Sequence, residues 1–394
     1  MIDEFSMRRL ALEKAFPLPP VTCSLEQSLD CFAAENIIAP LESPSFDNST
    51  FDGYAICDSD LAAGARLTLK GEQPAGVDRG LRVNKGECIR IFTGAPLPAN
   101  TAAVVMQEDT RQEEGIVIFS EATNSAFGIR RKGMDVCKGQ QLIAVGQRLT
   151  PPLAGLLASQ GFSKISVGSK PRISILCTGN EIRRSGEERV AGEIYESNGI
   201  MLSLLFRHDA KTLPDTALVR DSLEEVREAI REKSENTDVL LICGGMSVGA
   251  YDFVPRALEL EGFQIEAHRV RLKPGKPFLY GTRGTQHVFG FPGNPVSAYV
   301  TALLFARPVI LRLAGAEEKA LGLLEIHASV TEAISNPDDR PHYVRGNYLK
   351  GVFAPSPMQQ SHALFRLSQS NALLRMAENT SLKQGEFASI FLLP

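Results

Sequence analysis

Short glycine-rich loops with hydroxyl, amide and carboxyl side chains follow several apolar runs in the middle of the sequence. They read CTGNE (177–181), GGMSVGAYD (244–252) and FPGNP (291–295), and RLKPGKP (271–277) adds two lysines. Glycine lets backbone amides approach a ligand closely. Asn294 and Pro295 open a predicted helix, whose N-terminus attracts anions. This chemistry suits a phosphate or another oxyanion.

The predicted binding residues are the small and polar members of these loops. Hydroxyl groups add hydrogen-bond donors, and lysines supply point charges for an oxyanion. The candidates with a ligand-binding role are Thr178, Gly179, Gly244, Gly245, Ser247, Gly249, Gly275, Pro292, Gly293 and Asn294, with Lys273 and Lys276 as the cations.

Two acids accompany the loops. Glu181 and Asp252 each follow a glycine-containing loop, and carboxylates in that position can hold Mg²⁺ beside a bound phosphate. For either acid alone, the alternative is a helix cap or a solvated turn. The neighbouring lysines favour the metal–phosphate interpretation.

A competing interpretation treats Ser247 as a nucleophile. Residues 245–249 fit the G-x-S-x-G pattern and follow an apolar run, as in serine hydrolases. Such a serine needs a histidine and an orienting group. The downstream histidines, none in a recognisable context, are His268, His287, His327, His342 and His362.

The loops need a scaffold that brings them together. Apolar runs of strand length (RISILCTG, DVLLICGG, FQIEAHRV and HVFGFPGNP) alternate with helical patterns (SNGIMLSLLFRHDA, DSLEEVREAIREK and DFVPRALELEG). Such alternation predicts a doubly wound α/β domain with a parallel sheet over about 170–315. Ligands bind at the carboxyl ends of such strands, so we expect the loops at one edge of the sheet.

The flanking regions have other patterns. Residues 54–135 hold short strand-like pieces between turns and predict a β-rich domain, and the chain after 316 predicts a small β domain. Ser24 and Gln27 form a capping-box pattern that predicts a helix over 24–38. TPPLAGLLASQG predicts another helix, ending at Gly161.

Composition narrows the class of protein. The formal net charge is -4, which gives no support to nucleic-acid binding. Seven cysteines without a CxxC pair indicate free thiols in a reducing compartment, and histidines without zinc spacing argue against zinc. The apolar segment 295–315 carries Arg307, Pro308 and Arg312, so it makes a poor membrane span. We expect a cytoplasmic protein.

At the level of motifs, the chain resembles the molybdopterin molybdenumtransferases, which insert molybdenum in the last step of molybdenum-cofactor synthesis; eukaryotic gephyrin contains a similar module. The resemblance runs nearly end to end. The motifs that carry it, in order, are DNSTFDGYA, RIFTGAPLPANTAAVVMQED, GIRRKGMDVCKG, PRISILCTGNEI, GEIYESN, CGGMSVGAYDF, KPGKP, FPGNPVSA and QQSHALFRLSQSNAL.

The resemblance implies a homodimer whose chain has four domains. They are a split linker domain (1–45 and 136–169), a β-rich domain (46–135), an α/β molybdopterin-binding domain (170–315) and a C-terminal β-barrel (316–394). This multidomain α/β architecture agrees with the patterns above.

The resemblance also implies a reaction. Adenylylated molybdopterin and molybdate, with Mg²⁺, become molybdenum cofactor and AMP, and other proteins of cofactor synthesis are potential partners. The residues that carry over as catalytic are Asp52, Asp135, Glu181, Asp221, Asp252, Lys273, Lys276 and Ser361. The roles of Asp52 and Ser361 rest on the resemblance alone, and either chain of a dimer can supply them.

The sequence departs from the family pattern at three places. Thr50 and Phe51 replace the usual Ala-Met, Met134 replaces a glutamate, and Asn180 replaces an aspartate. The last two remove carboxylates, which leaves open the metal geometry and the preference between molybdate and tungstate.

Two further functions stay open. A sibling enzyme adenylylates molybdopterin with a similar α/β domain, but it would not need the N-terminal arm or the C-terminal β domain. The other is that of a dimeric scaffold without catalysis; gephyrin also serves as a scaffold.

Overall fold

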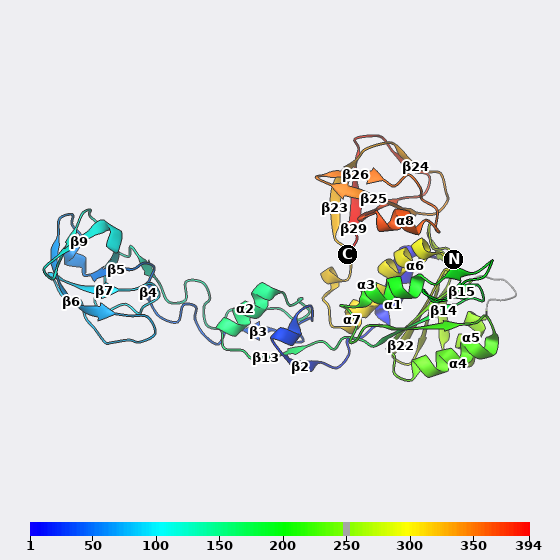
Figure 1. Cartoon of the computed structure of the whole chain (residues 1–394), viewed down its shortest axis with the longest axis horizontal. Helices are drawn as coiled ribbons and strands as arrows, with labels where there is room; N and C mark the ends of the chain where they lie inside the picture. The colour runs from blue at the N-terminus through cyan, green and yellow to red at the C-terminus, as the bar shows by residue number, and fades with distance from the viewer. Residues whose placement is uncertain (247–252) are drawn as a thin grey trace. The chain divides into compact units, whose positions relative to one another are not determined.

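The computed structural model describes residues 1–246 and 253–394, and the chain divides into two compact units. The first unit contains 1–35, 145–155 and 163–394, and the second contains 36–144 and 156–162. Figure 1 follows the chain from the N-terminus in blue to the C-terminus in red. Each unit is described by itself.

The centre of the first unit is a six-stranded sheet in the order β17-β14-β18-β22-β21-β19. β17, β14, β18 and β22 pair in parallel, whereas β21 is antiparallel to both of its neighbours, so β19 again runs with the first four. The bounds are β14 Ile173–Thr178, β17 Asp215–Val219, β18 Val239–Cys243, β19 Gln264–His268, β21 Leu279–Arg283 and β22 Gln286–Phe291. The predicted α/β fold is confirmed, with one reversed strand that the pattern did not indicate.

Helices cover both faces of this sheet (Figure 1). Alternate strand residues serve two cores, because successive side chains of a strand point to opposite faces. Ile175 and Cys177 pack with α1 (Glu4–Glu13) and α3 (Asn198–Phe206), whereas Leu176 packs with α4 and α5. α4 spans Leu223–Ser234 and α5 spans Val254–Leu260.

The start of α4 follows its sequence signal. The Ser222 hydroxyl accepts a hydrogen bond from the Glu225 amide at 3.2 Å, as the capping pattern predicts. Val226 and Ile230, one helical turn apart, are buried in the core beneath the helix.

A long apolar helical segment follows β22. It consists of α6 (Pro295–Thr301), a π-helical turn (Ala302–Ala306) and α7 (Arg307–Leu313). Pro308 lacks an N–H group and its ring crowds the preceding turn, which accounts for the wide π turn before it. Pro295–Leu313 is long and apolar enough to cross a membrane, but 78% of its most apolar window is buried inside the protein.

The C-terminal part of the first unit is a closed barrel of five strands, as predicted. Its order is β23-β26-β25-β27-β29. The strands are β23 Glu325–Val330, β25 His342–Leu349, β26 Val352–Pro355, β27 Ala372–Met376 and β29 Phe387–Leu392; β24 Ile334–Asn336 pairs with β28 Thr380–Leu382, and α8 is Leu364–Ser368.

The second unit is rich in β structure, as the turn-punctuated pattern predicts. Its six-stranded sheet has the order β8-β5-β7-β6-β10-β9. The strands are β5 Gly53–Ile56, β6 Arg66–Gln73, β7 Glu87–Ile91, β8 Ala103–Met106, β9 Thr110–Glu113 and β10 Ile116–Phe119; the smaller pairs are β3 Ile37–Ile38 with β12 Gln141–Ile143, and β4 Asn48–Ser49 with β11 Ile129–Arg130.

The predicted helix over 24–38 is wrong. The helical structure in that stretch is a single 3₁₀ turn at Glu26–Ser28, and Asp30 has a positive φ of 61° that an α-helix does not accommodate. The preceding strand β2 (Val21–Ser24) pairs instead with β13 (Lys164–Val167). The other linker helix is confirmed as α2 (Pro151–Ser159), followed by Gly161 with φ +88°.

The shortest elements complete the chain. They are β1 Ile2–Asp3 with β20 Val270–Arg271, β15 Ile182–Arg183 with β16 Ile194–Tyr195, and 3₁₀ turns at Asp58–Asp60, Gln107–Asp109 and Glu318–Ala320.

Candidate functional site

Two of the predicted loops touch at Thr178, the last residue of β14. A Cβ atom added at Gly244 would lie 2.4 Å from the Thr178 carbonyl oxygen, and one added at Gly245 would lie 3.0 Å from its hydroxyl oxygen. Both glycines also have positive φ, +92° and +62°. Only glycine at these positions lets the two strand ends approach so closely.

Hydrogen bonds join the remaining strand ends to this point. Asn198 at the start of α3 donates through Nδ2 to the Gly293 carbonyl at 2.7 Å. The amide of Gly244 donates to the Phe291 carbonyl at 3.1 Å. The predicted meeting of the CTGNE, GGMSVG and FPGNP loops at one edge of the sheet is therefore confirmed for their described residues.

A cavity of about 360 Å³ opens where these loops meet. It combines sulfur, hydroxyl, amide and carboxylate groups from β14, β18 and the starts of α3 and α6. Its lining residues are Cys177, Thr178, Glu181, Ile182, Ile194, Tyr195, Glu196, Ser197, Asn198, Cys243, Gly293, Asn294 and Pro295.

Two polar atoms in the cavity wall lack a hydrogen-bond partner within the described part of the chain. They are the hydroxyl oxygen of Thr178 and Oδ1 of Asn198. As whole residues, Thr178 is 6% exposed and Asn198 is 8% exposed. A buried polar atom without a partner costs about 1–3 kcal/mol. A bound ligand with matching donors and acceptors would remove that cost.

The sequence interpretation missed Glu196 as a cavity residue. Its Oε1 accepts a hydrogen bond from the Gly199 amide at 2.6 Å, which caps α3, and another from the Cys177 thiol at 3.3 Å. An acid just before a helix start, in YESN, is the signal that could have found it. The cavity therefore contains two carboxylates, Glu181 and Glu196.

Asp221 lies at the same edge of the sheet. Its amide donates to Oδ1 of Asn180 at 3.2 Å, which ties the loop after β17 to the loop after β14. Asn180 thus fixes one loop against another.

Ser361 lies beside the start of α6. Its carbonyl accepts a hydrogen bond from the amide of Val296 at 3.1 Å. Arg345 holds the surrounding loop; this arginine is 1% exposed and donates to the carbonyls of Met358, Gln360 and Ala363. Burial lowers the pKa of Arg345, yet three carbonyl acceptors hold the charged side chain in place.

The lysine loop follows β19, which points to the same edge of the sheet as β22. A Cβ atom at Gly275, where φ is +128°, would lie 2.4 Å from Cγ2 of Thr301, so this position requires glycine. Lys273 lies 3.6 Å from the Asp338 carboxylate. Lys276 is exposed and, within the described chain, has no ion pair; neither lysine lines the cavity.

Asp52 and Asp135 belong to the second unit. The Asp52 carboxylate accepts hydrogen bonds at 2.8 Å from both the amide and the hydroxyl of Thr93. Both hydrogen bonds lower the pKa of the Asp52 carboxyl group, and the bond from the Thr93 amide has the larger effect. The amide of Asp135 donates to the Ser43 carbonyl at 2.9 Å.

Ser247, Gly249 and Asp252 lie outside the described residues, so their predicted roles stay predictions. The last described residue before them, Met246, is buried, and its carbonyl lies 3.4 Å from Nε2 of His268.

The residues that line the cavity fit a magnesium ion that takes most of its coordinating oxygens from a bound phosphate and from water. Mg²⁺ prefers oxygen and is usually held by one or two carboxylates together with substrate phosphates and water. Glu181 supplies a carboxylate, and the unpartnered oxygens of Thr178 and Asn198 are of the same donor type. In residues 1–246 and 253–394 no group of three or more histidine, cysteine or acidic side chains forms a complete metal site.

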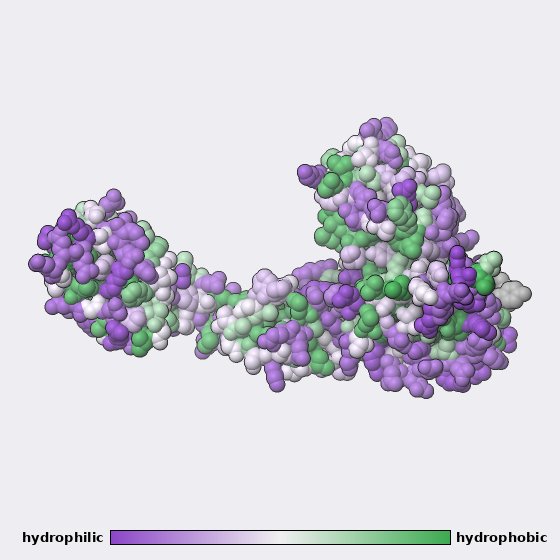
Figure 2. Space-filling model, in the orientation of Figure 1, coloured by the Kyte–Doolittle hydropathy of each residue, from purple (hydrophilic) through white to green (hydrophobic). Residues whose placement is uncertain are grey.

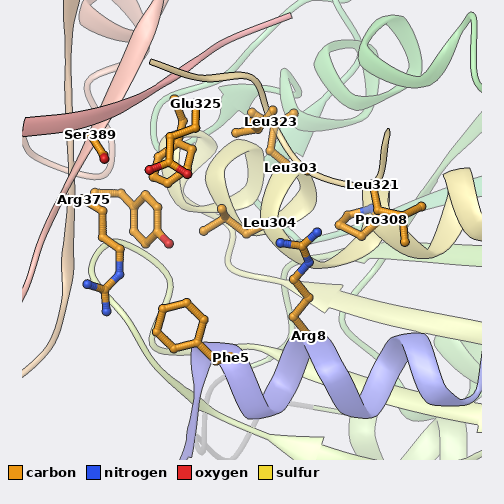
Figure 3. A pocket seen from close by; sticks show the side chains of 13 residues that line it. Phe5, Arg8, Leu303, Leu304, Pro308, Leu321, Leu323, Glu325, Arg375 and Ser389 are labelled. Carbon is orange, nitrogen blue, oxygen red and sulfur yellow. The ribbon is translucent and has the colours of Figure 1, made fainter. Parts of the chain in front are cut away.

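A second cavity of about 460 Å³ lies where α1, the helical segment 295–313 and the barrel approach one another. Figure 3 shows Phe5 and Arg8 of α1 facing Leu304, Arg375 and other residues of its wall. None of the predicted site residues lines it.

Solved structures and curated sequences similar to this chain point to one family. The crystal structure of the molybdopterin biosynthesis MoeA protein from Pyrococcus horikoshii OT3 covers all of both chains with 26% identity and a TM-score of 0.85. A molybdopterin molybdenumtransferase of Haemophilus influenzae is 36% identical over 77% of this chain and 75% of its own length. The chain belongs to the molybdopterin molybdenumtransferase family. A second member, from Synechococcus elongatus, is 32% identical over 92% of this chain and 91% of its own length.

Three family models together match nearly the whole length of this chain. The MoeA N-terminal region (domain I and II) matches 6–161, the probable molybdopterin binding domain matches 174–312, and the MoeA C-terminal region (domain IV) matches 327–393. The protein is thus a molybdopterin molybdenumtransferase enzyme of molybdenum-cofactor biosynthesis, and its cavity lies within the region that matches the probable molybdopterin binding domain. The exact limits of the four domains stay a prediction.

Proposed function

We propose that this enzyme takes adenylylated molybdopterin and molybdate and yields molybdenum cofactor and AMP. The observation that carries the proposal is the cavity at the edge of the sheet, where the buried oxygens of Thr178 and Asn198 have no partner in the described chain. An adenylylated pterin offers amino donors and phosphate acceptors that such a wall can bind.

The chain's own residues act in this proposal by electrostatic positioning. Gly293, which lines the cavity and would have no other atom within 4 Å of an added Cβ, leaves room for a phosphate oxygen close to the backbone, and the N-terminus of α6 adds a positive end. Lys276 supplies an exposed positive charge at the same edge. Groups fixed in advance around developing charge stabilise a transition state without reorganisation.

Magnesium belongs to the proposal because the cavity is acidic. Glu181 and Glu196 would repel a bound diphosphate, and a divalent cation between them offsets that repulsion. When bound, the ion would polarise the phosphate oxygens. Glu181 and Asp252 are the proposed ligands.

The homodimer and the cytoplasmic location are also proposed. α3 carries apolar side chains on both of its faces, and Ile200 and Leu204 are 59% and 52% exposed. Hydrophobic residues gather over α3 on the face shown in Figure 2. A helix that is apolar all round is normally buried, so a second copy of the chain is expected to cover it. All seven cysteines are free, as in proteins of a reducing compartment.

The test is AMP release from adenylylated molybdopterin with and without molybdate. The proposal expects release that depends on both molybdate and Mg²⁺. Consumption of ATP with free molybdopterin would instead identify the adenylylating activity, and an absence of turnover with intact folding would identify a scaffold. Labelling of Ser247 by a fluorophosphonate would support the hydrolase alternative.

A further inference from the structure

Two buried cysteines lie next to each other in the floor of the cavity. Cys177 in β14 and Cys243 in β18 are direct partners in the parallel register of the sheet. Each is 2% exposed, both belong to the same hydrophobic core, and both line the cavity. Their side chains therefore leave the sheet on the same face.

The spacing of paired strands suits a disulfide. Neighbouring strands lie about 4.8 Å apart, and disulfide-linked cysteines usually have Cα atoms about 4.4–6.8 Å apart. The contact with the Cys243 thiol, together with burial and the Glu196 carboxylate, raises the pKa of the Cys177 thiol. The register of the strands, the shared core and the shared cavity wall place the two thiols side by side.

We propose that Cys177 and Cys243 form a reversible disulfide when a hydroperoxide reaches the cavity. One thiol is oxidised to a sulfenic acid as the peroxide O–O bond breaks and one product molecule leaves (water, when the oxidant is hydrogen peroxide). The sulfur of the other cysteine then attacks the sulfenic sulfur, the S–S bond forms, and water carries away the hydroxyl group and the remaining thiol proton. A dithiol reductant restores both thiols.

The bond changes the wall of the cavity through Glu196. In the reduced state the Cys177 thiol donates to Oε1 of Glu196 at 3.3 Å, and the same oxygen accepts from the Gly199 amide at 2.6 Å. A disulfide has no S–H group, so Glu196 loses one of its two donors. Its charge is then less compensated beside the binding space, which disfavours an anionic ligand.

Formation of the disulfide does not depend on the proposed function, whereas weaker binding of adenylylated molybdopterin rests on it. Limited peroxide treatment followed by tryptic mapping without reduction tests the bond. It should give a linked pair of peptides 173–183 and 234–256 that dithiothreitol separates. Oxidation of these cysteines without that link, or no oxidation of them while the exposed Cys137 reacts, would overturn the proposal.

Binding of adenylylated molybdopterin to oxidised and reduced protein tests the consequence. We expect the Kd to rise about tenfold after oxidation and to return to its original value with dithiothreitol. In Cys243→Ser, peroxide treatment should leave the Kd unchanged. Cys137→Ser should respond as the unaltered chain does. A peroxide effect that persists in Cys243→Ser would contradict the consequence. If the reduced chain does not bind the nucleotide, the proposed function fails, whereas the peptide map still decides the disulfide.

Discussion

The carbonyl of Ser361 accepts a hydrogen bond from the amide of Val296 at 3.1 Å, which joins the loop before α8 to the first turn of α6. This contact spans 65 positions of the chain (361 − 296) and brings a serine of the C-terminal region to the edge of the sheet where the cavity lies. The hydroxyl of Ser361 is not needed for the contact.

The substitution Ser361→Ala separates the two roles of this residue. The backbone contact remains, so the melting temperature should stay within about 2 °C of the unaltered chain. The value of kcat/KM for molybdate-dependent AMP release should fall at least about tenfold, equivalent to about 1.4 kcal/mol. Ser368→Ala, an exposed serine of α8, is the matched control. Unchanged kinetics in Ser361→Ala would remove the serine from the site.

Arg345 is predicted to hold the Ser361 loop in place. The substitution Arg345→Met leaves three carbonyl groups without their donor, and it should lower the free energy of unfolding by about 3 kcal/mol. Urea unfolding measures this loss, and Lys383→Met, at an exposed position, should change stability by less than about 0.5 kcal/mol. A loss equally small in Arg345→Met would show that the loop stands without the arginine.

The sequence predicted the scaffold better than it predicted the connections between distant segments. The glycine loops were placed correctly because parallel strands end at one edge of a sheet, and local patterns identify the strands. Arg345 and Ser361 could not be placed, since their contacts depend on how the barrel packs on α6. Glu196 was missed because a single acid before a helix is also the ordinary signal of a cap.

The false helix at 24–38 has the same origin. Half of the expected capping box forms, since the Ser24 amide donates to Oε1 of Gln27 at 3.4 Å. Beyond it, Phe32 and Ala33 bridge to Arg148 and Val167 more than a hundred positions away. That pairing overrides the local helical preference, and nothing within 24–38 indicates it.

His287 should make stability depend on pH in the acid range. Burial, and to a smaller extent Lys14, lowers the pKa of this histidine from 6.5 to about 4. Between these values the unfolded chain binds a proton that the folded chain does not. Stability is therefore complete above about pH 6.5 and falls as the pH drops towards 4, by about 3 kcal/mol for this group.

The substitution His287→Gln tests this dependence. The variant is expected to be less stable at pH 7, because it disturbs the 3.1 Å contact of Nδ1 with the Tyr280 hydroxyl. Between pH 7 and pH 4.5, however, its free energy of unfolding in urea should fall by about 2–3 kcal/mol less than that of the unaltered chain. Parallel pH profiles of the two chains would mean that His287 titrates normally.

The exposed apolar face of α3 should hold two chains together. Ile200→Glu places a charge on that face and is expected to yield a monomer in sedimentation velocity, because an unpaired buried charge opposes association. Leu349→Glu, at a leucine of the barrel that is 70% exposed, is the control and should leave the state of association unchanged. A dimer that survives Ile200→Glu would place the interface elsewhere.

The most direct test of the cavity as the place of reaction compares two glutamates. Molybdate-dependent AMP release is measured over a Mg²⁺ titration for Glu181→Gln, which changes the cavity wall, and for Glu188→Gln, at an exposed glutamate outside it. We predict that Glu181→Gln lowers the rate about 100-fold and raises the Mg²⁺ requirement, whereas Glu188→Gln leaves both unchanged. Equal rates for the two variants, at the level of the unaltered chain, would contradict the assignment of this cavity.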